Sequence, residues 1–338
     1  MRRVLVPLAV APALCGGFAG VRLHSLTGQT MGTSWSVKLA LPEAVRIASV
    51  LETVERQLGV VVEQMSGWLP SSDLSRFNRA PVGRWISLPA EFFAVLDHAV
   101  ALAEETAGAF DPTLGNLVAL WGFGPEPVST LPPPQAVVTA ALARSGWRRL
   151  ELDRRNRRAR KSAAISLDLS GIAKGFAVDL ICDHLRELPL PGFLVEIGGE
   201  LRGEGVKPDG LPWWVALEQP LSLGIDPHND DTADIVALHH LAVATSGDYR
   251  RFFDSMGRRY CHTIDPRTGC SVTNGLAAVT VLHAGCMQAD ALATALSVLG
   301  AREGMAYARR HQVAARFISR GNSGFAEAMT PAFAAMLA

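Results

Sequence analysis

The clearest pattern of hydrophobic positions along the chain begins shortly after Pro42. Apolar residues recur every three or four positions over 47–65, and a Ser-Gly pair ends the run. This spacing places them on one face of a helix that packs against a core. A second run of the same kind covers 91–106 and stops before Gly108, a residue type that often closes helices. The sequence therefore predicts two long amphipathic helices in its first third.

Shorter strand and helix patterns follow one another along the rest of the chain. Small or polar residues alternate with apolar ones over 31–40, as in a half-buried strand. Short apolar runs typical of buried strands occupy 150–152, 165–169, 193–197, 213–218, 242–245 and 279–283, and helical patterns occupy 136–145, 171–188 and 290–300. Because strands and helices do not alternate strictly, the pattern favours an α+β fold, with a mixed or largely antiparallel sheet core packed with helices. Residues 21–338 are expected to form a single domain.

The first twenty residues differ from the rest. A basic pair precedes an apolar stretch that ends at Gly20, which is typical of a secretory signal. Pro7 and Pro12 interrupt this stretch, and Leu14 stands before Cys15, where a lipoprotein signal needs a small residue. An export segment and a flexible N-terminus are both open for residues 1–20. We expect the protein in the cell envelope, on the periplasmic side of the inner membrane, with the cytoplasm as the alternative.

Charge and cysteine content narrow the function classes. The chain has 32 Lys and Arg against 32 Asp and Glu, so no net charge attracts nucleic acid. The one basic run, 154–161, lies between the strand-like stretches 150–152 and 165–169 without interleaved aromatic residues, which favours a solvated hairpin tip. The five cysteines form no CxxC pair, so a zinc site is not supported. Cys261 and Cys270 are either separate thiols or, after export, a pair that closes a small loop.

A carboxylate, a tight turn and a helix follow one another at 168–179. Asp168 ends the strand, Gly171 lies in the turn, and Lys174 falls in the first turn of the helix. The N–H groups at a helix N-terminus and a lysine charge suit a phosphate group. The spacing is not that of a Walker A loop, so a plain strand–turn–helix connection is the alternative.

Asp290 and Thr294 are four residues apart in a predicted helix, among small alanines. Their oxygens therefore lie on one face, one turn apart. A carboxylate and a hydroxyl form a sensible partial site for Mg²⁺, which takes its remaining ligands from phosphate and water. In the alternative, Asp290 caps the helix N-terminus and Thr294 only packs.

Two further groups are candidates for chemistry. His262 and Asp265 lie just before or at a Pro- and Gly-containing turn, where they could serve acid–base roles, although a lone histidine is often structural. Phe110 and Asp111 follow a helix and could stack on and hydrogen-bond a flat heterocycle, as could Trp68. Core packing and a helix-terminating turn are the alternatives for these residues.

Taken in order, these segments resemble the ApbE family, the FAD:protein FMN transferases. The resemblance runs from Met31 to at least Gly300 and rests on MGTSWSV, MSGWLPSSDLSRFN, AFDPTLG, LDLSGIAKGFAVD, VEIGGELRGEG, TSGDYRRFF, HTIDPRTG and ADALATALSVLG. It implies a Mg²⁺-dependent transferase that takes FMN from its substrate FAD and attaches it by a phosphoester bond to a threonine or serine of another protein, releasing AMP. A Mg²⁺-dependent FAD pyrophosphatase and a non-catalytic FAD-binding protein are the alternatives.

The resemblance also implies roles for individual residues. The metal would be held by the backbone carbonyl of Gly171 and by Asp290 and Thr294. FAD would lie against Met31, Trp68, Ala109, Phe110, Asp111, Asp168, Lys174 and Ile264. His262 or Asp265 would accept the proton of the attacking hydroxyl. The acceptor would be a flavoprotein with a threonine-containing motif, either a subunit of a membrane redox pump or a flavin reductase.

Overall fold

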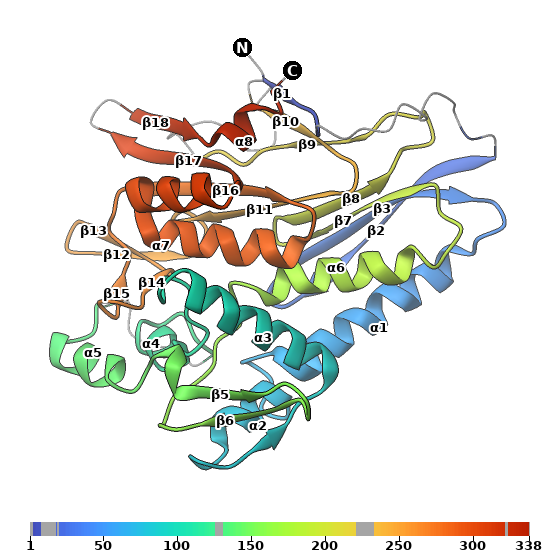
Figure 1. The fold of residues 1–338 in the computed structure, drawn as a ribbon. Coiled ribbons are helices and arrows are strands. Elements are labelled where there is room, and N and C mark those ends of the chain that lie inside the picture. The colour runs from blue at the N-terminus through green and yellow to red at the C-terminus, as the bar shows by residue number, and fades with distance from the viewer. Residues whose placement is uncertain are drawn as a thin grey trace.

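A single large antiparallel sheet runs through the centre of the computed structural model (Figure 1). The structure describes residues 3–7, 18, 20–125, 131–220, 233–321 and 324–337. The sheet has eight strands in the order β18-β17-β16-β11-β8-β7-β3-β2, and every neighbouring pair in it is antiparallel. Helices pack against it, so the predicted α+β fold with a largely antiparallel core is confirmed.

The strands of this sheet are assembled from the whole length of the chain. They are β2 (Val21–Thr30), β3 (Thr33–Pro42), β7 (Gly192–Ile197), β8 (Glu200–Gly205), β11 (Leu241–Gly247), β16 (Leu276–His283), β17 (Ala314–Gly321) and β18 (Gly324–Met329). Along β7, Phe193 and Val195 join the core on the helical face, whereas Leu194 joins the core on the opposite face. Strands covered on both faces appear as continuous apolar runs, which is how the sequence predicted β7, β11 and β16. It missed β2, β8, β17 and β18. The residues of β18 are mostly exposed, and charged and glycine residues interrupt the apolar pattern of β8.

Two helices lie directly on one face of the sheet, and a third packs on one of them (Figure 1). The bounds of the helices are α1 (Ile47–Met65), α2 (Asp73–Arg79), α3 (Ala90–Glu105), α4 (Gly115–Leu120), α5 (Gln135–Leu142), α6 (Ala173–Leu185), α7 (Cys286–Arg310) and α8 (Pro331–Ala334). Helices α6 and α7 contact the sheet and each other, and α1 packs on α6. Asp179 of α6 accepts hydrogen bonds from the N–H groups of Cys286 and Met287 at 3.0 and 2.8 Å. This carboxylate caps α7 and locks the two helices together.

The opposite face of the sheet is covered by a small sheet and α8. Strands β1 (Val4–Leu5), β10 (Ile235–Leu238) and β9 (Trp213–Ala216) form this small sheet. Leu5 is buried among its apolar residues, and Arg3 forms an ion pair with Asp234 at 2.5 Å. Residues 1–2, 8–17 and 19 of the predicted export segment, which include Pro12, Leu14 and Cys15, lie outside the described residues. No helix in the described part of the chain combines the length and apolarity that crossing a bilayer requires.

The basic run forms a hairpin different from the one predicted. Strand β5 (Leu150–Asp153) pairs with β6 (Arg158–Lys161), and β6 pairs in turn with β4 (Ile86–Ser87). Residues 165–169, the predicted second strand, contain only an isolated bridge between Ser166 and Leu114. The exposed turn at 154–157 agrees with the predicted solvated hairpin tip, but the second strand was predicted in the wrong place. Arg158 and Arg160 form ion pairs with Asp153 and Glu151, so that an arginine-rich segment can lie in a strand.

Short elements complete the chain around the lower and left-hand parts of Figure 1. They are the 3₁₀ helix Trp147–Arg149 and the strands β12 (Phe252–Ser255), β13 (Arg258–Cys261), β14 (Ile264–Asp265) and β15 (Cys270–Ser271). Cys261 on β13 and Cys270 on β15 are free thiols rather than a disulfide.

The close packing of α6 on α7 yields a test with two opposite outcomes. A Cβ at Gly175 would lie 2.8 Å from the Cβ of Asp290 and closer still to the carbonyl oxygen of Cys286, whereas nothing lies within 4 Å of a Cβ at Gly59 in α1. Gly175→Ala should lower the free energy of unfolding by about 1–3 kcal/mol, because α6 must move away from α7. Gly59→Ala should raise it by about 0.5–1 kcal/mol, because alanine loses less backbone entropy in a helix. Urea unfolding of both variants checks the pair, and a neutral Gly175→Ala would contradict the contact.

Candidate active site

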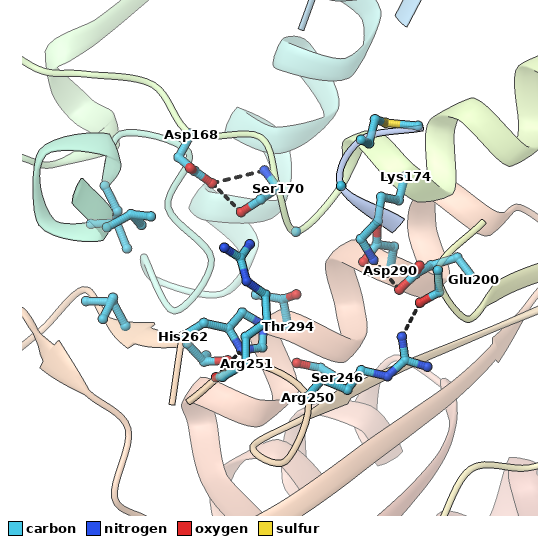
Figure 2. A pocket seen from close by; sticks show the side chains of 18 of the residues that line it. Asp168, Ser170, Lys174, Glu200, Ser246, Arg250, Arg251, His262, Asp290 and Thr294 are labelled. Atoms are coloured by element: carbon cyan, nitrogen blue, oxygen red, sulfur yellow. Dashed lines mark hydrogen bonds and ion pairs between the residues drawn. The ribbon is translucent and has the colours of Figure 1, made fainter. Parts of the chain in front are cut away.

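One large cavity, of about 910 Å³, opens beside the N-terminal turn of α6 (Figure 2). Its walls come from segments far apart in the sequence, namely the β2–β3 turn, the segment after α3, the turn before α6, the β7–β8 turn, the segments flanking β12 and β13, and α7. The volume is in the upper part of the range for ligand pockets, so a molecule of dinucleotide size fits. All the residues proposed to contact metal or FAD line this cavity.

The turn before α6 places one positive charge at the cavity wall. Asp168 accepts a hydrogen bond from the N–H of Ser170 at 3.0 Å, which shapes the turn. The N–H of Ala173 donates to the carbonyl of Leu169, and that of Gly175 donates to Asp290. These two N–H groups are therefore not free for an anion, contrary to the general expectation for a helix start. What the start of α6 contributes toward an anion is the ammonium group of Lys174, and Arg250 and Arg251 line the same cavity.

Three oxygen donors meet where this turn touches α7. Asp290 is buried. It is the fifth residue of α7, which begins at Cys286, so it is not the helix cap. Its Oδ2 accepts the N–H of Gly175 at 3.0 Å, and burial raises the pKa of its carboxyl group. A Cβ at Gly171 would lie only 2.9 Å from Oγ1 of Thr294, so glycine lets the turn approach the threonine.

This donor set fits a hard divalent cation. A carboxylate, a hydroxyl and a backbone carbonyl are oxygen ligands of the kind that Mg²⁺ prefers. Among the described residues no group of three or more His, Cys, Asp or Glu side chains could hold a metal ion. Gly171, Asp290 and Thr294 are therefore the residues that could hold a metal in this cavity.

A buried glutamate that the sequence analysis did not identify faces Lys174 (Figure 2). Glu200 is only 3% exposed, and its Oε1 lies 2.5 Å from the Nζ of Lys174. Its Oε2 is buried and has no hydrogen-bond partner in the described part of the chain. Burial raises the pKa of Glu200 to about 7, although the Lys174 charge opposes the shift. Burial lowers the pKa of Lys174, but Glu200 and Asp290 outweigh this effect and raise it.

The only sequence signal for Glu200 was its position after the Gly198-Gly199 kink. Both glycines have positive φ, 61° and 97°, which lets the chain reverse between β7 and β8 at the cavity. The first residue of β8 then points into the site. Neither periodicity nor the resemblance gave this glutamate a role.

His262 lies in the wall as a neutral imidazole. Burial lowers the pKa of His262 to about 4, assisted by the charges of Arg251, Lys174 and Arg250. Its Nδ1 lies 3.2 Å from the carbonyl oxygen of Arg251, which can only accept, so Nδ1 carries the hydrogen. The Nε2 lone pair is then available to take a proton at neutral pH.

The structure does not bring Asp265 to the cavity. Its carboxylate is bound by the guanidinium of Arg267 at 2.9 Å, and Arg267 also donates to the carbonyl of Val298 in α7 at 3.1 Å. Asp265 is absent from the cavity lining. It ties the Pro-Arg-Thr-Gly turn to α7, so only His262 of the two predicted proton acceptors is placed to act.

The remaining predicted contacts form an apolar side of the cavity. Trp68 is 51% exposed, so core packing does not explain it, and the Arg251 guanidinium lies 5.8 Å from its ring centre. Phe110 and Ile264 are buried and also line the cavity. Asp111 accepts the N–H of Trp147 at 3.0 Å, so it holds its loop in place as well as facing the cavity. Met31, at the β2–β3 turn, and Ala109 line the cavity as well.

The raised pKa of Glu200 predicts how stability changes with pH. Between pH 4.5 and about 7 the folded protein holds a proton on Glu200 that the unfolded chain has released. Unfolding therefore releases a proton in this window, and the free energy of unfolding falls as pH rises, by up to about 3 kcal/mol. Glu200→Gln cannot titrate and should lose this part of the fall.

Urea unfolding of metal-free protein between pH 5 and 8 measures this slope. Glu187→Gln removes an exposed carboxylate. It is the control and should keep the wild-type slope. An unchanged slope in Glu200→Gln would contradict the assignment.

Known proteins of similar sequence and structure belong to one family. A family model described as the ApbE family matches residues 31–317. The chain is 37% identical to the FAD:protein FMN transferase of Vibrio cholerae serotype O1 over 334 residues, covering 98% of each chain. It is 31% identical to the FAD:protein FMN transferase of Escherichia coli K12 over 316 residues, covering 92% of this chain and 88% of the other. The crystal structure of the apo flavinyl transferase ApbE of Pseudomonas stutzeri has a TM-score of 0.85 and 39% identity, covering 94% of this chain and 97% of that one. The chain described here belongs to the ApbE family.

Proposed function

We propose that this protein is an FAD:protein FMN transferase that uses Mg²⁺ and modifies a threonine or serine of an acceptor protein. The observation that carries the proposal is the meeting, in one cavity, of a lysine charge, a hard oxygen donor set and a neutral histidine. The names of the relatives support flavin transfer. The metal and the acceptor hydroxyl are inferred from the chemistry of the site.

Binding of FAD would use two sides of the cavity. Trp68, Phe110 and Ile264 present flat or apolar surfaces suited to a ring system. The ammonium group of Lys174 lies where a pyrophosphate can reach both it and the turn at Gly171. Mg²⁺, held by Gly171, Asp290 and Thr294, would neutralise charge on the pyrophosphate. The ion pair with Glu200 keeps the lysine side chain ordered before the substrate arrives.

The transfer step needs a proton acceptor for the attacking hydroxyl. Nε2 of His262 would take this proton while the hydroxyl oxygen forms a bond to the phosphorus on the FMN side. The bond from that phosphorus to the bridging oxygen breaks, and AMP leaves with the electron pair. A bound pyrophosphate would add negative charge near His262, which would favour the protonated imidazole and so make His262 a better base. Lys174 stabilises the charge that develops on the phosphate oxygens.

The acceptor class and the compartment stay predictions from the sequence. A flavoprotein with a threonine-containing motif, such as a membrane redox pump subunit or a flavin reductase, is the proposed partner. A location on the periplasmic side of the inner membrane would bring the two together. Neither bears on how the cavity works.

Asp290→Asn tests the metal assignment with little change in shape. The amide oxygen can still accept the N–H of Gly175, but the negative charge is gone. FMN transfer to a threonine-motif acceptor should fall at least about 100-fold, because charge at the pyrophosphate is no longer neutralised. Mass spectrometry of acceptor incubated with protein, FAD and Mg²⁺ detects one added FMN per threonine.

The same samples separate the alternative activities. Release of FMN and AMP without modified acceptor would indicate a pyrophosphatase, and unchanged FAD would indicate a binding protein. Asp183→Asn on the exposed side of α6 is the matched control and should transfer normally. Full activity in Asp290→Asn would refute the metal site.

His262→Ala tests the proton acceptor. The loss of a general base should lower kcat by about 10²- to 10⁴-fold, while the Kd for FAD changes little. Added imidazole should restore part of the rate, because it can enter the space left by the side chain. FMN transfer assays, quenched at set times over a range of imidazole concentrations, measure the loss of rate and its recovery. A variant with a wild-type kcat would show that His262 is not the base.

A further inference from the structure

The β12–β13 hairpin stands at the rim of the cavity. The residues just before it, Arg250 and Arg251, and those just after it, His262 and Thr263, all line the cavity. The two flanks are joined by a hydrogen bond from the N–H of His262 to the carbonyl of Arg251 at 3.0 Å. In Figure 1 the hairpin lies at one end of the molecule, outside the large sheet. A polypeptide whose hydroxyl reaches His262 therefore comes close to the base of this hairpin.

The inner face of the hairpin is held rigidly by aromatic rings. Phe253 and Tyr260 stack with ring centres 5.2 Å apart. Tyr260 stacks in turn on Trp121 at 5.5 Å, and Phe253 stacks on Phe123 at 5.8 Å. A two-stranded hairpin is marginally stable alone, so this stack is what keeps it in place. The outer face is thereby presented in one conformation before any partner binds.

The outer face and the tip expose apolar and cationic groups together. Met256 is 97% exposed in the two-residue turn, and Phe252 is 39% exposed. The guanidinium of Arg259 lies 3.7 Å from the ring centre of Phe252. Aromatic, methionine and arginine side chains are the types enriched in protein interfaces. A turn that only reversed the chain would not need an apolar side chain at its tip.

The hairpin and the residues beside it form a basic region in a chain whose charges balance overall. Residues 250–262 contain four arginines and one carboxylate, Asp254. Arg250 is engaged by Glu218, and Arg259 lies 3.4 Å from Asp254. Arg251 and Arg258 contact aromatic rings and have no carboxylate partner in the described part of the chain. Their charges are free to act on a partner.

We propose that the β12–β13 hairpin is the docking surface for the acceptor protein. It takes a segment that carries carboxylate side chains and an apolar side chain beside the reactive hydroxyl. The carboxylates meet Arg259 on the outer face and Arg258 beside the turn, and the apolar side chain meets Phe252 and Met256. The pair of Arg259 with Asp254 is exposed to solvent on both sides, so it is weak and a partner's carboxylate can replace it. This inference rests on the proposed transferase function, because only a protein substrate has to cross the rim.

A second arginine-rich hairpin provides the matched control. The β5–β6 hairpin carries Arg155 and Arg157 at its exposed turn, and neither contributes to the cavity lining. Arg155→Glu/Arg157→Glu therefore changes the net charge as much as Arg258→Glu/Arg259→Glu does. A difference in peptide binding between the two variants therefore reflects where the charges lie and not the net charge of the protein.

The experiment uses the full chain with FAD and Mg²⁺ and two labelled twelve-residue peptides. Each peptide has one central threonine and one leucine, and four flanking positions are aspartate in one peptide and asparagine in the other. Fluorescence anisotropy should show the aspartate peptide binding about tenfold more tightly at low salt, with the preference shrinking as salt rises. Arg258→Glu/Arg259→Glu should lose the preference while keeping the wild-type Kd for FAD. The control variant should keep both.

Mass spectrometry of the same mixtures separates the two proposals. FMN on the threonine of the aspartate peptide, reduced in Arg258→Glu/Arg259→Glu, supports both. Selective binding without FMN transfer to either peptide counts against the transferase function and leaves the surface assigned. Equal binding of the two peptides by the wild-type protein, or an unchanged preference in Arg258→Glu/Arg259→Glu, overturns the docking surface.

Discussion

The first turn of α6 lies directly against the start of α7, and the rest of the site depends on this contact. Gly175 has no side chain, so the two helices approach until its N–H reaches the carboxylate of Asp290. Asp179, one turn further along α6, accepts the first N–H groups of α7. These two connections hold Gly171 and Lys174 beside Asp290 and Thr294, although more than a hundred residues separate the helices. A small rotation of either helix would separate the oxygen donors from the lysine.

Burial of charge gives this contact its chemical character. Asp290 and Glu200 are both almost inaccessible, and burial raises the pKa of each. Lys174 lies between them and stays charged because two carboxylates outweigh its own burial. Buried ion pairs contribute little net stability, since removing charges from water costs about as much as their attraction returns. In this site the ion pair instead keeps Lys174 charged and ordered at the place where a pyrophosphate would bind.

The buried cavity contains the groups proposed for chemistry, and the exposed rim contains the groups proposed to bind the acceptor. Burial, assisted by the cations around the cavity, lowers the pKa of His262 and keeps it neutral, which suits a group that must accept a proton. At the rim, Arg258 and Arg259 face solvent, where screening weakens each charge and several must act together. An aromatic stack that includes Phe253 and Tyr260 joins the two regions. The same hairpin thus supports the wall behind His262 and presents the outer surface.

The sequence alone determined the local structure and much of the candidate site. Hydrophobic spacing located α1 and the strands β3, β7, β11 and β16, because burial on one or both faces leaves a periodic pattern in the sequence itself. The sequence also predicted the four-residue spacing of Asp290 and Thr294 and the glycine turn before Lys174. Both features depend only on residues that are close together along the chain. Only the tertiary structure decided which charges meet. Glu200 was recognised once β8 placed it against Lys174, and Asp265 was removed from the site once Arg267 was seen to hold it. Ion pairing, burial and pKa depend on distances between segments remote in the chain, and local periodicity carries no information about those distances.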